Sequence, residues 1–165
     1  NVARVLWDKL QAQPDIGTLQ RLSLYEDEDL CADLTAEAGP EVASVTRRYS
    51  FTAVHDGHRG HTWDLFVSVH GPIDRETGMV TDIVALDHLL KERVLVPFDG
   101  RDLRVVLATP SVTGEYLAKA VWDRIVSAIP AGTLQLVKLV QTRDLFYPQH
   151  TILPAAFGRH GEHHR

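Results

Sequence analysis

Two runs of alternating residues between positions 48 and 82 constrain the fold of this 165-residue chain more than any other feature. From Tyr49 to His55, aromatic, alanine and histidine side chains alternate with serine, threonine and valine, and a second alternating run extends from His61 to His70. Successive side chains of a β-strand point to opposite faces of a sheet, so a period of two residues indicates two strands. The glycine-containing segment 56–60 is typical of a turn, and the sequence therefore predicts a β-hairpin.

The predicted hairpin brings two histidines together. A five-residue loop over positions 56–60 would place His55 directly opposite His61 and Ala53 opposite Trp63. Directly opposed Cβ atoms in a strand pair lie about 4.5–5.5 Å apart. We therefore expect two imidazoles side by side at the mouth of the hairpin, on its apolar face, which is half of a metal site.

Three short motifs in this region resemble those of a known family. Residues 51–55 read FTAVH, residues 60–63 read GHTW and residues 71–82 read GPIDRETGMVTD. In this order they resemble the FxAxH, HGHNY and GxxDxxTGMVxD motifs of the 6-pyruvoyl-tetrahydropterin synthase and 6-carboxytetrahydropterin synthase family. The resemblance implies an α+β tunnelling fold, in which an antiparallel sheet has two helices packed on one face and oligomerises into a barrel.

Composition limits the partners that the chain can have. The formal net charge of −5 argues against a nucleic-acid-binding surface built on bulk positive charge. No apolar run reaches the roughly 18 residues that a membrane span requires, so we predict no membrane partner. The single cysteine, Cys31, excludes an internal disulfide and fits a reducing cytoplasm, which is the location that we predict.

The beginning of the chain repeats a later segment without a gap. Residues 1–30 align with residues 116–145, and ten aligned pairs are identical. These pairs are Ala3/Ala118, Trp7/Trp122, Asp8/Asp123, Gly17/Gly132, Thr18/Thr133, Leu19/Leu134, Gln20/Gln135, Leu24/Leu139, Asp29/Asp144 and Leu30/Leu145. In both segments an amphipathic helical pattern ends near a proline, and Gly-Thr then opens an apolar strand. The identities favour an internal repeat over chance similarity between two helix–strand units.

The repeat and the resemblance together predict a division into domains. Residues 1–33 correspond to the C-terminal helix and strand of a first tunnelling-fold repeat, and residues 44–150 to a second tunnelling-fold domain. The acidic composition and the Gly-Pro pair between them predict a linker at 34–43. The short polar tail at 151–165 is expected to be disordered.

Two helices are predicted inside the second domain. Asp82 is a suitable N-cap for a helix over residues 83–94, and Thr113 for a later amphipathic helix. Residues 94–107 are predicted to form short apolar strand or turn, and residues 134–140 the last clear strand.

The resemblance implies a zinc ion held by one histidine of the first motif and two of the second. His55 and His61 occupy the outer two of these three positions, but the middle position holds Arg59, which cannot ligate a metal. His58, one residue away, is the candidate third ligand. The alternative is a pair of histidines on a sheet surface with no metal.

The remaining site residues depart from the family pattern. No cysteine lies in segment 56–60, and of the family's Asp-His pair only Asp99 remains, followed by Gly100, so Asp99 is the catalytic candidate. The family's pterin-anchoring Glu-Thr dipeptide is Gln141-Thr142 here, whereas the first repeat keeps a carboxylate, Glu26, at the position of Gln141. Glu26, Gln141 and Thr142 are therefore the candidate substrate-binding residues.

Three functions remain open from the sequence. The first is a divergent pterin-synthase-like protein that binds a pterin or related heterocycle at an inter-domain site, as a zinc-dependent lyase acting on dihydroneopterin triphosphate. The second is a non-catalytic tunnelling-fold subunit with a structural or ligand-binding role, and the third is a metal-free enzyme of the same fold. In each case we expect a homo-oligomer, because an open sheet has edges that association can close.

Overall fold

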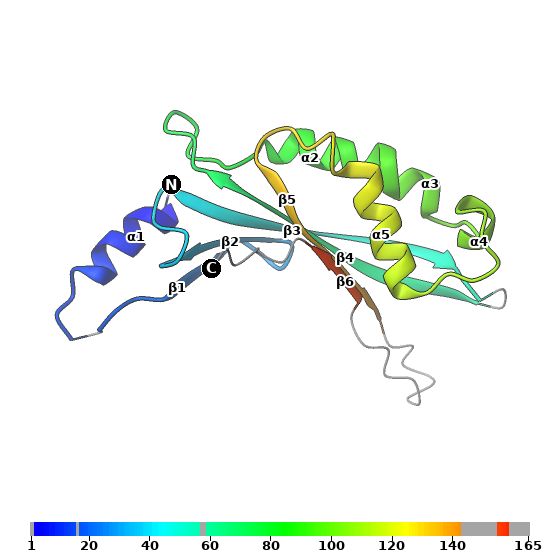
Figure 1. Cartoon of the computed structure of the whole chain (residues 1–165), viewed down its shortest axis with the longest axis horizontal. Helices are drawn as coiled ribbons and strands as arrows, with labels where there is room; N and C mark the ends of the chain where they lie inside the picture. The colour runs from blue at the N-terminus through cyan, green and yellow to red at the C-terminus, as the bar shows by residue number, and fades with distance from the viewer. Residues whose placement is uncertain (1, 16, 57–58, 143–154, 159–165) are drawn as a thin grey trace, which may run out of the picture.

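A single six-stranded antiparallel sheet, with the strands in sequence order, organises the chain (Figure 1). The computed structural model describes residues 2–15, 17–56, 59–142 and 155–158. The strands are β1 (Arg21–Tyr25), β2 (Leu30–Thr35), β3 (Val42–Val54), β4 (Gly60–Pro72), β5 (Thr133–Gln141) and β6 (Ala155–Gly158). The helices are α1 (Val2–Gln11), α2 (Ile83–Leu90), α3 (Val96–Phe98), α4 (Leu103–Val106) and α5 (Gly114–Ile125), with a π-helical turn η1 (Lys91–Leu95) after α2. The architecture is α+β, as predicted.

The central hairpin is formed by β3 and β4, but its register differs from the predicted one. Ala53 pairs with His61 and Phe51 with Trp63, so the predicted pairing of His55 with His61 is wrong by two residues along β3. The five-residue loop begins at His55 instead of Asp56, because Val54 is the last residue of β3 and pairs with Gly60. The N–H of Val54 also donates a hydrogen bond to the carbonyl of Arg101, at 2.9 Å, and this bond fixes the end of the strand.

The buried apolar residues of the sheet share one face, and the helices pack on it. Ala32 pairs with Val45 and Val45 with Val69, so alternating residues of β2, β3 and β4 point to the same side. Helix α1 packs on β1 and β2, and α5 packs on β5 and β6. The largest fully buried side chains are Phe98, Leu34, Leu65, Leu86, Leu90, Leu103, Leu117, Ile125, Leu134, Leu139, Val67 and Val69. Burial of this set is the main force that holds the helices on the sheet.

Both predicted helix N-caps are confirmed. The carboxylate of Asp82 accepts the N–H of Ala85 at 3.1 Å, and the hydroxyl of Thr113 accepts the N–H of Tyr116 at 3.2 Å. The prediction of strand or turn over residues 94–107 is confirmed for the turn at 99–101 and is wrong for most of the remainder, which forms the end of η1, α3 and α4. Val94 and Phe98 are spaced by one helical turn and both are fully buried, so tertiary packing decides the local structure.

Two segments that were predicted to be irregular contain strands. Residues 30–35 form β2, whose last two residues lie in the predicted linker at 34–43, so only residues 36–41 connect β2 to β3. Leu34 is fully buried, and Asp33, which points to the other face, is paired with Arg21 at 3.0 Å. In the predicted disordered tail at 151–165, residues 155–158 form β6, and the rest lies outside the described residues.

The local geometry follows the internal repeat. Ala3 and Trp7 of α1 are buried, as are their counterparts Ala118 and Trp122 of α5. Gly17 and Gly132, which precede β1 and β5, both have a positive φ, of 67° and 78°.

The strand pairings repeat as well. Leu22 of β1 pairs with Leu34 of β2, and its counterpart Val137 of β5 pairs with Phe157 of β6. The β1–β2 and β5–β6 hairpins therefore correspond to each other. The assignment of the two copies to two tunnelling-fold domains stays a prediction, and under it β2 belongs with the first copy.

Among the described residues, no helix is both long and apolar enough to cross a membrane.

Candidate functional site

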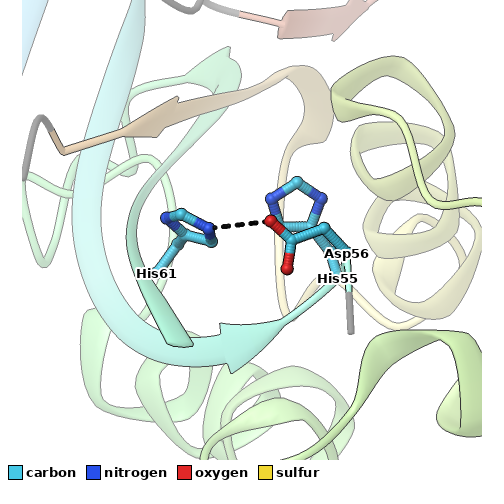
Figure 2. A group of neighbouring side chains, drawn as sticks. All are labelled: His55, Asp56 and His61. Carbon is cyan, nitrogen blue, oxygen red and sulfur yellow. Dashed lines mark hydrogen bonds and ion pairs between the residues drawn. The ribbon is translucent and has the colours of Figure 1, made fainter. Parts of the chain in front are cut away.

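The mouth of the β3–β4 hairpin gathers two imidazoles and a carboxylate (Figure 2). One potential ligand atom from each of His55, Asp56 and His61 lies within 4.8 Å of the other two. Nε2 of His61 is 3.3 Å from Oδ2 of Asp56, and the rings of His55 and His61 have their centroids 5.0 Å apart. His55 and His61 are half-buried and Asp56 is exposed, so the cluster opens to solvent on the carboxylate side.

The cluster is carried by the first two loop residues after β3 and by the start of β4. His61 is the second residue of β4 and points to the helix-covered face, as Trp63 does two residues later. His55 leaves β3 and packs its ring edge-on against Trp63, with the centroids 5.4 Å apart. Asp56 follows directly, and its Oδ1 accepts the N–H of Arg59 across the loop, at 3.4 Å.

The donor set fits a divalent metal ion of the zinc type. Zinc binds imidazole nitrogens and carboxylate oxygens at about 2.0–2.2 Å, so tetrahedral ligand atoms lie roughly 3.4 Å from one another. The His61–Asp56 separation of 3.3 Å already matches that spacing. Nε2 of His55 is buried and has no hydrogen-bond partner in the part of the chain that the structure describes. A small movement of the His55 ring would bring the third donor into place.

The third member of the described cluster is a carboxylate, and His58 as a metal ligand stays a prediction. His58 lies outside the described residues, and the side chain of Arg59, at the middle family position, is exposed. Asp56 takes the third place in the cluster. Sequence reasoning missed it because the search was for a third histidine. The signal that pointed to Asp56 was a carboxylate immediately after His55 at the start of the loop.

Asp99 lies beside β3 and is hydrogen-bonded to it near the hairpin mouth. Its Oδ1 accepts the N–H of Thr52 at 2.9 Å, and the next N–H, that of Gly100, donates to the carbonyl of Thr52 at 2.7 Å. Thr52 is three residues before His55. The carboxylate of Asp99 therefore anchors the loop 99–102 to β3.

Gln141 lies on the same face of the sheet as the histidines. It pairs with Trp63 across β4 and β5, and its Oε1 is buried with no hydrogen-bond partner among the described residues. Nε1 of Trp63 is in the same situation. The hydroxyl of Thr142, by contrast, donates to the carbonyl of Thr62 at 2.7 Å, so this side chain fixes the end of β5 to β4.

Glu26 is not brought to the histidines within one chain. It is exposed at the end of β1, where its N–H donates to the carbonyl of Leu30. Leu30 pairs with Arg47 of β3, and His55 lies eight residues beyond Arg47, which is about 26 Å at the usual rise of a strand. Glu26 therefore lies beside the middle of β3, well away from the cluster at the end of that strand.

Comparisons with known proteins agree with this fold. A family model described as 6-pyruvoyl tetrahydropterin synthase matches residues 44–147, which is more than half of the chain. Two relatives called 6-pyruvoyl tetrahydrobiopterin synthase, from Pongo abelii and Homo sapiens, are 32% and 31% identical over 125 residues, covering 61% of this chain and 86% of each relative.

A solved structure gives the fold independently. The structure of Caenorhabditis elegans 6-pyruvoyl tetrahydropterin synthase resembles this one with a TM-score of 0.59 and 21% identity, over 72% of this chain and 96% of that chain. The predicted tunnelling fold is thereby confirmed, while its assembly into a barrel stays a prediction. Together, the family model and the fold identify this chain as a member of the 6-pyruvoyl tetrahydropterin synthase family.

Proposed function

We propose that the chain binds a divalent metal ion of the zinc type at His55, Asp56 and His61 and presents it to a pterin-type heterocycle. The observation that carries this proposal is the convergence of three donor atoms within 4.8 Å at the mouth of one hairpin. The buried Nε2 of His55, which no described residue satisfies, supports it. An orphaned buried nitrogen costs roughly 1–3 kcal/mol, a cost that a ligated metal would remove.

A bound divalent ion would act as a Lewis acid that polarises an oxygen of the substrate. Asp56 adds a negative charge that a ligand set of three histidines lacks, and this charge offsets part of the charge of the ion. Trp63 packs against the ring of His55 and so limits the orientations that this imidazole can adopt. The chain thus has its own means of orienting one of the three proposed ligands, His55.

The names of the relatives point to a pterin-type substrate, and Gln141 is the residue to which we assign its recognition. Gln141 pairs with the residue two positions after His61, so a ring that contacts the metal site is within reach of its amide. An amide offers one acceptor and donors from its NH₂ group, whereas a carboxylate offers acceptors alone. We assign Glu26 to a site in an assembled oligomer, where a neighbouring unit would supply the partner groups.

The reaction class that we propose is a lyase acting on dihydroneopterin triphosphate, with the free oxygen of Asp99 as proton acceptor. A second candidate is a ligand-binding subunit without turnover. It is favoured by Gly100 in place of a histidine and by the bond from Thr52 N–H that already occupies one oxygen of Asp99. A group bound to a donor in this way is a weaker base.

Turnover and binding distinguish the two candidates. Zinc-loaded protein is mixed with dihydroneopterin triphosphate and product is followed, while calorimetry measures binding of the same compound. A lyase gives turnover that His61→Ala and Asp99→Asn abolish and that His88→Ala, an exposed histidine on α2, retains. Binding without turnover identifies the ligand-binding subunit, and Glu26→Gln then tests whether the oligomer uses this carboxylate. Neither binding nor turnover would contradict both candidates.

A further inference from the structure

Three polar atoms beside the hairpin mouth are buried and have no hydrogen-bond partner in the part of the chain that the structure describes. They are Nε2 of His55, Nε1 of Trp63 and Oε1 of Gln141. A bound metal ion would account for His55, whose imidazole belongs to the cluster in Figure 2. It would not account for Trp63, because an indole N–H only donates hydrogen bonds. Trp63 and Gln141 therefore remain as a pair of groups that the metal site does not explain.

The two residues of this pair face each other across β4 and β5. Directly opposed residues have their Cβ atoms about 4.5–5.5 Å apart, so the two side chains occupy one small region of the helix-covered face. Trp63 is 3% exposed and Gln141 is half-buried. The next pair on this face is Leu65 with Leu139, both buried, and their side chains offer neither a donor nor an acceptor.

Both residues of the pair are held in place by their surroundings. The indole ring of Trp63 packs edge-on against the ring of His55, with the centroids 5.4 Å apart. Gln141 is the last residue of β5, and Thr142 fixes this end of the strand with two hydrogen bonds to the carbonyl of Thr62, from its N–H at 2.9 Å and its hydroxyl at 2.7 Å. Groups that are fixed before a ligand arrives lose little entropy when they bind it.

The hydrogen-bonding pattern of the pair identifies the chemistry that it complements. The indole supplies one donor, and the amide supplies an oxygen acceptor and an NH₂ donor. Oε1 of Gln141 is buried, as is Nε1 of Trp63, so we place the acceptor next to the indole and the NH₂ group beyond it. The order is then donor, acceptor, donor. Its complement is acceptor, donor, acceptor, which is the edge of a cyclic imide with an N–H between two carbonyl groups.

We infer that Trp63 and Gln141 select a fused pyrimidine-2,4-dione over a 2-aminopyrimidin-4-one. The indole N–H donates to one carbonyl of the dione, the ring N–H donates to Oε1 of Gln141, and the NH₂ group of Gln141 donates to the second carbonyl. A pterin has an amino group in place of the second carbonyl, so two donors would face each other there. This inference rests on the proposed function, because it deepens the assignment of Gln141 to ligand recognition. It implies that dihydroneopterin triphosphate binds less tightly than its 2-oxo counterpart.

Two commercially simple rings test this preference: lumazine, which is pteridine-2,4-dione, and pterin, which is 2-aminopteridin-4-one. Calorimetry measures the binding of each to the full chain, with and without zinc, at a pH at which both rings are neutral. We expect lumazine to bind at least about tenfold more tightly than pterin, because a mismatched donor in a desolvated site stays unpaired.

Substitutions at the pair should change the preference in defined ways. Gln141→Glu should reverse it, because a carboxylate accepts both N–H groups of the pterin edge and repels the second carbonyl of the dione. The matched control is Gln135→Glu, the same change at an exposed residue of β5, which should keep the wild-type preference. Trp63→Phe keeps an aromatic ring beside His55 and removes the N–H. It should weaken lumazine binding about tenfold with the zinc content unchanged.

The outcomes separate this inference from the proposed function. Wild-type protein that binds pterin as tightly as lumazine, or more tightly, would overturn the inference and leave the proposed function standing. Binding of neither ring would overturn both. Unchanged lumazine affinity in Trp63→Phe would contradict the role of the indole N–H. Circular dichroism verifies that each variant retains its fold.

Discussion

The imidazole rings of His55 and His61 lie with their centroids 5.0 Å apart, although the residue that pairs with His61 across the hairpin is Ala53. His55 reaches back from the first position of the loop, where the ring of Trp63 supports it. The two potential ligands are therefore held by different means, one by a strand and one by packing.

Asp56 is predicted to be a metal ligand. Asp56→Asn keeps the size of the side chain and removes its charge, so we expect zinc affinity to fall about 10- to 100-fold in competition with a chromophoric chelator. The size of the effect follows from the loss of an anionic ligand beside a dication. Asp123→Asn, an exposed carboxylate on α5, is the control and should leave the affinity unchanged. Equal affinities of wild type and Asp56→Asn would remove Asp56 from the site.

Gln141 is predicted to set the preference for the ligand. In Gln141→Glu, a carboxylate replaces the amide and can accept two N–H groups of a 2-aminopyrimidinone ring. We expect tighter binding of a pterin, by about tenfold in calorimetry, and a small loss of stability because the new charge is partly buried. Weaker binding by this variant would mean that the ring presents an acceptor to Gln141.

Tyr49 makes the stability of the fold sensitive to alkaline pH. Its hydroxyl donates to Oδ1 of Asp87 at 2.8 Å, and burial, followed by the Asp87 carboxylate, raises the pKa of the phenol far above its usual value. The folded pKa lies above the unfolded one, so the contribution is complete below about pH 10 and is lost as the pH rises further. Denaturant melts between pH 9 and 12 should show a steeper loss of stability for wild type than for Tyr49→Phe. Parallel slopes would contradict this.

The repeat supplies a matched pair of glycines. Both Gly17 and Gly132 have a positive φ, but a Cβ at Gly132 would lie 2.9 Å from the carbonyl oxygen of His70 in β4, whereas at Gly17 nothing lies within 4 Å. Gly17→Ala should therefore cost about 1 kcal/mol, from the backbone conformation alone. Gly132→Ala should cost about 2–4 kcal/mol, because steric overlap is added. The free energy of unfolding from urea melts measures the cost of each substitution. Equal costs would show that β4 moves enough to accommodate the new Cβ at position 132.

Much of the fold could be predicted from local patterns. The alternation in 49–55 and 61–70 predicted the hairpin, and Asp82 and Thr113 predicted two helix starts, because capping depends on residues within one turn. The register could not be predicted, since it depends on where the loop begins, and that is set by the bond between Val54 and the distant Arg101. The strand β2 could not be recognised from the sequence. An aspartate such as Asp33 is typical of an exposed loop, and its ion pair with Arg21 is known only from the structure.

The candidate site was also predicted in part from a local pattern. The predicted hairpin placed His55 near His61, and the two rings are close in the observed register as well. Asp56 could not be recognised by periodicity, because loop residues do not alternate. The separation of Glu26 from the histidines follows from the order of the strands in the sheet, which the repeat alone did not specify.

Metal binding at the hairpin mouth is tested most directly by the zinc content of the full chain, purified without a histidine tag and measured by mass spectrometry after dialysis against a weak chelator. We expect close to one equivalent for wild type and for His88→Ala, and a loss of most of the metal in His55→Ala and His61→Ala. Wild-type protein that retains no zinc, cobalt or other divalent ion after reconstitution, or that retains it equally in His61→Ala, would contradict the account.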